Sequence, residues 1–198
     1  VVIGTVVPTQ PKDAYVSRVA AVNAGIPTDA PAMNVNRLCG SGLQAIVSAA
    51  QAIALGEHDV AVAGGAESMS NAPHMVLSAR NGQKMGNIEM VDAMLGALHD
   101  PFENIHMGVT AENVAERCGI SREEQDAVAV ESHKRAAAAI AAGYFKEQIV
   151  PVEIKTRKGV TIFDTDEHVR ADASLEGMGG LRPVFKKDGT VTAGNASG

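Results

Sequence analysis

The first third of the chain alternates between short apolar runs and longer stretches with apolar positions at helical spacing. Residues 1–7 are rich in β-branched side chains, which favours a strand. Residues 13–25 have apolar side chains at helical spacing and end on a glycine, the residue most often found just past a helix. The pattern then predicts a strand over residues 32–35, a helix over residues 41–55 and a buried strand over residues 60–63.

This order of elements defines the expected fold class. A strand, a helix and a second strand within about 30 residues are typical of a βαβ unit with a right-handed crossover. Such units build parallel sheets, whose strands are usually buried on both faces. We therefore expect an α/β fold in which residues 60–63 are buried.

The pattern changes after residue 64. Residues 68–107 are rich in methionine and loop-like, apart from an amphipathic stretch at residues 88–98. The sequence SREE at residues 121–124 is a capping box that opens a helix. Beyond the loop-like part, the pattern predicts helices over residues 110–119 and 121–142 and β segments over residues 149–155 and 160–163.

Composition and charge exclude several classes of function. The chain has 198 residues, of which 45% are hydrophobic and 20% charged, as in ordinary globular proteins. Its formal net charge of −6 argues against general binding of nucleic acid or of a membrane surface, and no apolar run approaches membrane-spanning length. Two cysteines make no disulfide framework, which favours a reducing, cytoplasmic location. Because the chain opens inside a predicted strand and ends in a predicted turn, we expect it to be part of a longer protein.

Cys39 lies in the sequence NVNRLCGSG, between a predicted strand and a predicted helix. Thiolates rather than thiols are nucleophiles, and the start of a helix favours the thiolate through its dipole and unpaired N–H groups. We expect Gly40 and Gly42 to let the backbone turn sharply and a ligand approach closely. The alternative is that Cys39 fills a small buried site, as free cysteines often do.

Histidine spacing does not identify a partner for a nucleophilic cysteine. A cysteine hydrolase would need such a histidine. Six histidines are present, and their spacing selects none of them. From the residues alone, the choice between nucleophile and core residue stays open.

Several segments together resemble the thiolase family, the acetyl-CoA acetyltransferases and 3-ketoacyl-CoA thiolases. NVNRLCGSGLQAIVSAAQAIALG, followed by DVAVAGGAESMSNAPHM, is similar to the nucleophile region of that family. Further segments resemble thiolase sequences in the same order: HMGVTAENVA, SREEQDAVAVESHKRA, FKEQIVPV and GTVTAGNASG. The resemblance covers essentially the whole chain.

The resemblance implies a partial thiolase fold of the α/β class. Residues 1–65 would belong to the N-terminal core domain. Residues 66–198 would form the inserted mixed α/β loop domain, which binds coenzyme A and builds a homotetramer. The C-terminal thiolase domain and the extreme N-terminus are not represented in these 198 residues.

The resemblance also implies an acyltransferase that condenses two CoA thioesters and cleaves the 3-ketoacyl-CoA product in reverse. Cys39 would carry the acyl group, coenzyme A would be a substrate, and neither a metal nor a permanently bound cofactor is expected. The family's Asn-Glu-Ala-Phe segment, its Gly-His-Pro segment and its second catalytic cysteine have no match here. The 198 residues alone are therefore expected to be inactive, and a non-catalytic CoA-binding fragment is the alternative.

Other residues correspond to the family's coenzyme A site. Arg170 would face the nucleotide end, where a fixed positive charge suits phosphate. Cys118 falls in no catalytic motif and is interpreted as structural. The residues expected to contact coenzyme A or substrate are His106, Met107, Arg170, Ala193, Ser197 and Gly198. On the residues alone, an ordinary loop, packing or surface position is the commoner role for such residues.

Overall fold

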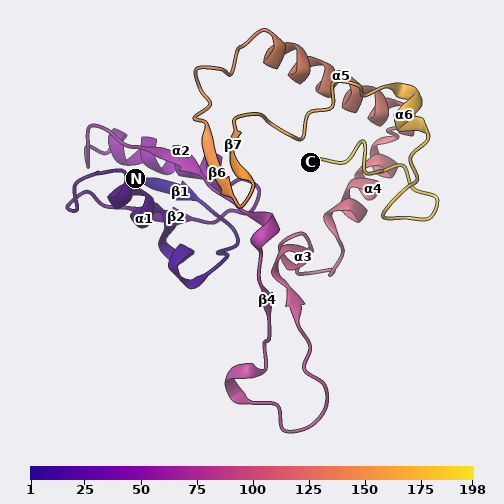
Figure 1. The fold of residues 1–198 in the computed structure, drawn as a ribbon. Coiled ribbons are helices and arrows are strands. Elements are labelled where there is room, and N and C mark those ends of the chain that lie inside the picture. The colour runs from indigo at the N-terminus through magenta and orange to yellow at the C-terminus, as the bar shows by residue number, and fades with distance from the viewer. The chain divides into compact units, whose positions relative to one another are not determined.

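A computed structural model describes residues 1–198 of the chain. The chain divides into two compact units, Val1–Asn104 and Ile105–Gly198 (Figure 1). No helix in either unit is both long enough and apolar enough to cross a membrane.

The first unit is built on a three-stranded parallel sheet in the order β2–β1–β3. The strands are β1 (Val2–Gly4), β2 (Met33–Val35) and β3 (Ala63–Gly65). Two α-helices connect them: α1 (Val16–Asn23), which follows the 3₁₀ turn η1 (Pro11–Tyr15), and α2 (Ser41–Ala54). The predicted βαβ organisation and α/β fold class are therefore confirmed.

The helices pack on this sheet through small side chains. Ala45 and Ala49 are the buried apolar residues of α2, and Ala21 is that of α1. Small residues let a helix backbone approach a sheet closely, which agrees with a sequence rich in alanine and glycine. The core of the first unit is thus thin and depends on close backbone contact.

Two predicted strands differ from the structure. The first is shorter than residues 1–7, because the N–H groups of Val6 and Val7 donate to the Glu67 carboxylate instead of continuing the sheet. The strand predicted over residues 60–63 begins only at Ala63, where pairing with β1 starts. Val60 is 81% exposed, so the expected burial of residues 60–63 was wrong.

The remainder of the first unit is a long, largely irregular excursion. Strands β4 (His74–Met75) and β5 (Val91–Asp92) pair antiparallel at its base, and α3 (Ala93–Ala97) follows. Two 3₁₀ turns lie within it, η2 (Met69–Asn71) and η3 (Ala79–Asn81). The predicted loop character is confirmed, and the amphipathic stretch becomes β5 and α3.

The second unit contains three helices and one hairpin. The helices are α4 (Met107–Cys118), α5 (Arg122–Ala141) and α6 (Leu175–Gly179). Strands β6 (Val152–Thr156) and β7 (Gly159–Phe163) pair antiparallel (Figure 1). The predicted capping box is confirmed by reciprocal hydrogen bonds between Ser121 and Glu124 at 3.1 and 2.8 Å.

The boundary between the two units lies at residues 104 and 105. The boundary predicted between core and loop domain, after residue 65, lies at the end of β3 inside the first unit. That assignment concerns the domains of the complete fold and stays a prediction.

The tightest contact in the first unit joins β1 to the start of α2 at Gly4. A Cβ atom on Gly4 would lie 2.5 Å from the carbonyl oxygen of Ser41 and 2.7 Å from the amide nitrogen of Gly42. Both atoms belong to the backbone and have no flexible side chain that could move aside. Hydrogen is therefore the only side chain that this position accepts without displacement of the helix.

Replacing Gly4 with alanine should push the start of α2 away from the sheet. We expect Gly4→Ala to lower the free energy of unfolding of the complete protein by about 1–3 kcal/mol, the usual cost of overpacking a core. Urea unfolding measures this change. Gly64→Ala is the matched control, since a Cβ on Gly64 meets no atom within 4 Å. Equal stability of the two variants would contradict this account.

Candidate active site

Cys39 lies in a tight turn between β2 and α2. The preceding residue, Leu38, has φ of 47°, in the left-handed region that non-glycine residues rarely adopt. Three side-chain hydrogen bonds hold this turn. Leu38 N–H donates to Asn36 Oδ1 at 3.0 Å, and the Ser41 hydroxyl donates to the Leu38 carbonyl at 2.6 Å. The same hydroxyl accepts from Arg37 N–H at 2.9 Å.

The expectation that glycines make the sharp turn was wrong, whereas the expectation that they let a ligand approach stays a prediction. Gly40 is the N-cap of α2 and has φ of −88°, which any residue can adopt. Gly42 lies within the helix, and the left-handed residue is Leu38. The sharp bend therefore comes from side-chain hydrogen bonds around a strained leucine, which glycine positions in the sequence do not reveal.

Cys39 is exposed and lines a cavity of about 390 Å³ within the first unit. Within these 198 residues the cysteine therefore does not fill a buried core site. Its backbone N–H donates to no group within these 198 residues. The cavity wall is largely apolar and includes Val6, Met69, Met94 and Leu98. Such a wall suits an apolar ligand.

The one charged residue in the cavity lining is Glu67. Its carboxylate accepts hydrogen bonds from Val6 N–H at 2.8 Å and Val7 N–H at 3.0 Å. The sequence analysis missed both Glu67 and Asn36. A signal exists for Glu67, because it follows β3 by two residues and polar groups often gather at the carboxyl edge of a parallel sheet.

In the second unit, Glu112 of α4 holds the C-terminal segment. This side chain is only 4% exposed. Its carboxylate accepts from Thr190 N–H at 2.9 Å, from the Thr190 hydroxyl at 3.1 Å and from Val191 N–H at 2.8 Å. Burial raises the pKa of Glu112, but these hydrogen bonds and the nearby Lys186 charge outweigh burial and lower the pKa below its usual value.

A second polar cluster shapes the residues that follow. Asn195 accepts from Thr192 N–H at 2.7 Å and donates to Asp126 at 2.8 Å. Asp126 is buried on α5 and pairs with Arg122 at 2.7 Å. Ser197 and Gly198 come directly after this turn, so α4 and α5 together set their position.

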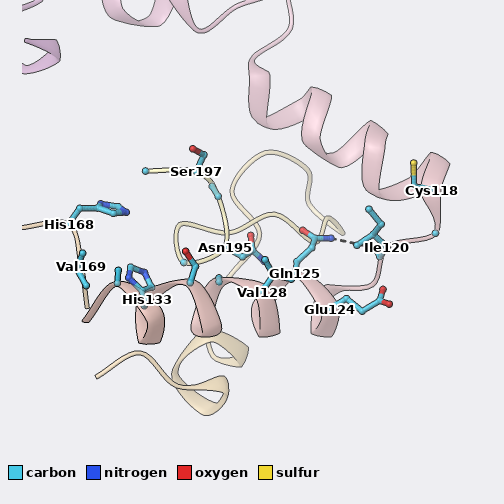
Figure 2. Close-up of a pocket in the computed structure, with 17 residues that line it drawn as sticks. Cys118, Ile120, Glu124, Gln125, Val128, His133, His168, Val169, Asn195 and Ser197 are labelled. Atoms are coloured by element: carbon cyan, nitrogen blue, oxygen red, sulfur yellow. Dashed lines mark hydrogen bonds between the residues drawn. The ribbon is translucent and has the colours of Figure 1, made fainter. Parts of the chain in front are cut away.

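Ser197 and Gly198 line a cavity of about 810 Å³ in the second unit. His133 on α5 and His168 lie at one end of it, and Gln125 lies toward the other (Figure 2). The centres of the two imidazole rings are 5.8 Å apart. Cys118, interpreted as structural, is exposed at the end of α4 and also lines this cavity.

Arg170 and Ala193 line a neighbouring cavity of about 370 Å³. The two cavities share His133, His168, Gly194 and Ala196. The backbone N–H of Arg170 donates to His133 Nδ1 at 3.2 Å, which ties the backbone of the arginine to α5. The structure thus brings four of the predicted residues, Arg170, Ala193, Ser197 and Gly198, around one pair of histidines.

His106 and Met107 lie at the start of α4 and line neither of these two cavities. His106 caps the helix by accepting from Gly108 N–H at 2.9 Å, and its ring stacks on Phe185 at 4.8 Å. Met107 is partly exposed. Cys39 belongs to the first unit and the six other predicted site residues belong to the second.

Residues 1–198 match the family described as the N-terminal domain of thiolase. The chain belongs to the thiolase family. It is 66% identical over its whole length to the beta-ketothiolase BktB of Cupriavidus necator, and covers 50% of that protein. It is 53% identical over 92% of its length to an acetyl-CoA acetyltransferase of Chromobacterium violaceum, and covers 47% of that protein.

Solved structures support the same conclusion for the fold. The crystal structure of human mitochondrial 3-ketoacyl-CoA thiolase in complex with CoA matches 100% of the chain with a TM-score of 0.92 and 44% identity. The chain covers 49% of that structure. The predicted thiolase fold is confirmed, and the chain spans about half the length of the curated relatives it matches.

The hydrogen bonds that Glu112 accepts from Thr190 and Val191, here called the Glu112 clamp, should make the free energy of unfolding depend on pH in the acid range. We expect Glu112→Gln to lower the free energy of unfolding of the complete protein by about 1–3 kcal/mol at pH 7, through lost hydrogen bonds to a charged group. Because the folded pKa lies below the unfolded value of about 4.3, this stabilisation is present above that value and is lost as the pH falls through the folded pKa.

Urea unfolding at several pH values measures the difference between the wild type and Glu112→Gln. The difference should shrink below about pH 4. Glu116→Gln on the same helix is the matched control, since that carboxylate is largely exposed and lies 3.7 Å from Lys186. A gap between wild type and Glu112→Gln that does not vary with pH would rule out the clamp as a charged acceptor.

Proposed function

We propose that the complete protein is an acetyl-CoA C-acyltransferase that works through an acyl-Cys39 intermediate. Membership of the thiolase family and relatives named acetyl-CoA acetyltransferase support this proposal. The observation that carries it is Cys39 itself, which is exposed beside the start of α2 and lines a largely apolar cavity.

In the degradative direction, the Cys39 thiolate attacks the keto carbon of a 3-ketoacyl-CoA. The bond between the α carbon and that keto carbon breaks, and acetyl-CoA leaves after its enolate is protonated. Coenzyme A then attacks the Cys39 thioester, takes the acyl group and restores the thiolate. In the synthetic direction, Cys39 is acylated first and an acetyl-CoA enolate attacks the thioester.

Each step places negative charge on an oxygen atom, which backbone N–H groups can stabilise. The N–H of Cys39 donates to no group within these 198 residues and suits this role. The base that forms the enolate and the group that activates the thiol would come from segments of a complete thiolase outside these 198 residues.

We further propose that the second unit binds coenzyme A. A neighbour in the thiolase family is described in complex with CoA, which supports this assignment. Arg170 would bind phosphate, while Ala193, Ser197 and Gly198 would contact the pantetheine arm. His106 and Met107 would lie beside the acyl end. No metal or permanently bound cofactor enters this scheme.

The oligomeric state, the cellular location and the metabolic role are proposed on the same basis. We expect a homotetramer in the complete protein, a cytoplasmic location and a role in fatty acid metabolism. The long excursion that carries β4 and β5 is the part expected to join subunits.

Selective alkylation tests the role of Cys39. In the complete protein, we expect iodoacetamide to label Cys39 at least about tenfold faster than Cys118, because the proposed mechanism requires Cys39 to react as a nucleophile. Acetyl-CoA should protect Cys39 and leave Cys118 unaffected. Peptide mass spectrometry after timed labelling measures both rates in one sample, and Cys118 is the internal control since both cysteines are exposed. Equal rates without protection would remove Cys39 from the mechanism.

The binding role of Arg170 has a separate kinetic signature. Arg170→Ala should raise KM for CoA thioesters about tenfold and leave kcat nearly unchanged, because uniform binding energy is lost. Steady-state thiolysis of acetoacetyl-CoA measures both constants. Arg157→Ala, in the turn between β6 and β7, removes the same charge from the same unit and should change neither constant. An unchanged KM in Arg170→Ala would show that Arg170 is an ordinary surface residue without a role in CoA binding.

Residues 1–198 expressed alone should show no measurable thiolysis of acetoacetyl-CoA. Members of a catalytic unit act together, and the remaining ones do not rescue the loss of the others. Adding the rest of a thiolase chain should restore activity, and that activity should disappear in Cys39→Ala. Turnover by the isolated 198 residues, with their mass confirmed, would show that the catalytic groups are assigned wrongly.

A further inference from the structure

We propose that Asn36 and Glu67 are positioning residues, which together hold the turn that presents Cys39. They form a path of hydrogen bonds from the loop after β3, through the loop after β1, to the residue before the nucleophile. The proposal rests on the proposed role of Cys39, but its test includes a measurement that does not require turnover.

The path is needed because the turn is strained. Leu38 has φ of 47°, a backbone conformation that is unfavourable for a residue with a Cβ atom. Such a residue keeps this conformation only where its surroundings fix it. If Leu38 relaxed to an extended conformation, the Cys39 side chain would change direction relative to α2.

Asn36 uses both ends of its amide at this point. Its Oδ1 accepts from Leu38 N–H at 3.0 Å, and its Nδ2 donates to the Val6 carbonyl at 3.3 Å. The first bond fixes the peptide that enters the strained residue. The second ties that peptide to the loop after β1, whose Val6 lines the Cys39 cavity.

Glu67 fixes the same loop from the other side. Its two carboxylate oxygens accept from the N–H groups of Val6 and Val7, at 2.8 and 3.0 Å. Hydrogen bonds to a carboxylate are stronger than neutral ones. They orient the peptides on both sides of Val6, and therefore also the carbonyl that receives Asn36.

The location of these groups argues against a purely structural role. Glu67, Val6, Val7, Leu38 and Cys39 all line one cavity, and Glu67 is its one charged lining residue. A carboxylate whose only task was to close a loop would not need to lie in the wall of the nucleophile's cavity. Here the path ends at the peptide bonds that set the direction of the Cys39 side chain.

Two substitutions in the complete protein separate this proposal from a general loss of stability. Asn36→Ala removes both of its hydrogen bonds, whereas Glu67→Gln keeps the side-chain shape and replaces one acceptor oxygen with a donor. Each should lower the rate of Cys39 alkylation by iodoacetamide about tenfold and leave Cys118 unchanged. Each should also lower kcat for thiolysis by about 10- to 100-fold with KM changed less than about twofold, since small displacements at a reacting centre are costly.

The double variant tests whether the two residues act along one path. Effects that pass through the same loop are not additive, so the double variant should be only about as slow as the slower single variant. Glu57→Gln is the matched control, since Glu57 is an exposed carboxylate of the same unit and lies outside the Cys39 cavity. It should leave both cysteine labelling rates and kcat unchanged.

The labelling ratio in Glu67→Gln decides between a positioning role and no such role. A fall in the ratio of Cys39 to Cys118 labelling in Glu67→Gln, with unfolding at wild-type temperature, supports the proposal even if Asn36→Ala fails to fold. Labelling ratios and kcat that match the wild type in folded Glu67→Gln would overturn it. If the wild-type protein shows no thiolysis, the proposed function fails, and the labelling ratios alone decide whether Asn36 and Glu67 position Cys39.

Discussion

The direct backbone contact between β1 and the start of α2 is the constraint on which the environment of Cys39 depends. Gly4 lies so close to Ser41 and Gly42 that no side chain fits between them. The strand therefore brings the helix start to the carboxyl edge of the sheet, where the loops after β1 and β3 also begin. Cys39 lies one residue before the N-cap of α2, so this contact fixes its position relative to the sheet.

Both units hold their irregular segments with side-chain acceptors. In the first unit Glu67 binds two consecutive N–H groups, and in the second Glu112 does the same for Thr190 and Val191. A loop has no neighbouring strand to satisfy its N–H groups, and leaving them unpaired is costly where water is excluded. Acidic side chains on regular elements or beside them therefore give these loops one defined shape without adding a strand.

The sequence predicted the regular elements well, because local signals specify them. Glycines end helices, the capping box opens α5, and β-branched runs mark the strands. Family motifs identified Cys39 and the thiolase fold. Strand limits were wrong where Glu67 takes up the N–H groups of Val6 and Val7, and the left-handed residue was Leu38 rather than a glycine. The strand limit depends on contacts between residues about 60 positions apart, which no local pattern encodes. The left-handed Leu38 is held by side chains only two and three residues away, in a combination that glycine positions do not reveal.

The Glu112 clamp has a consequence for how the second unit moves. Thr190 and Val191 lie outside any helix or strand, yet their N–H groups donate to a buried carboxylate, and Val191 itself is buried. Exchange of these amide hydrogens with solvent requires α4 and the C-terminal segment to separate. In a deuterium-exchange experiment, this loop should therefore form an island of slow exchange, as protected as the helix that holds it.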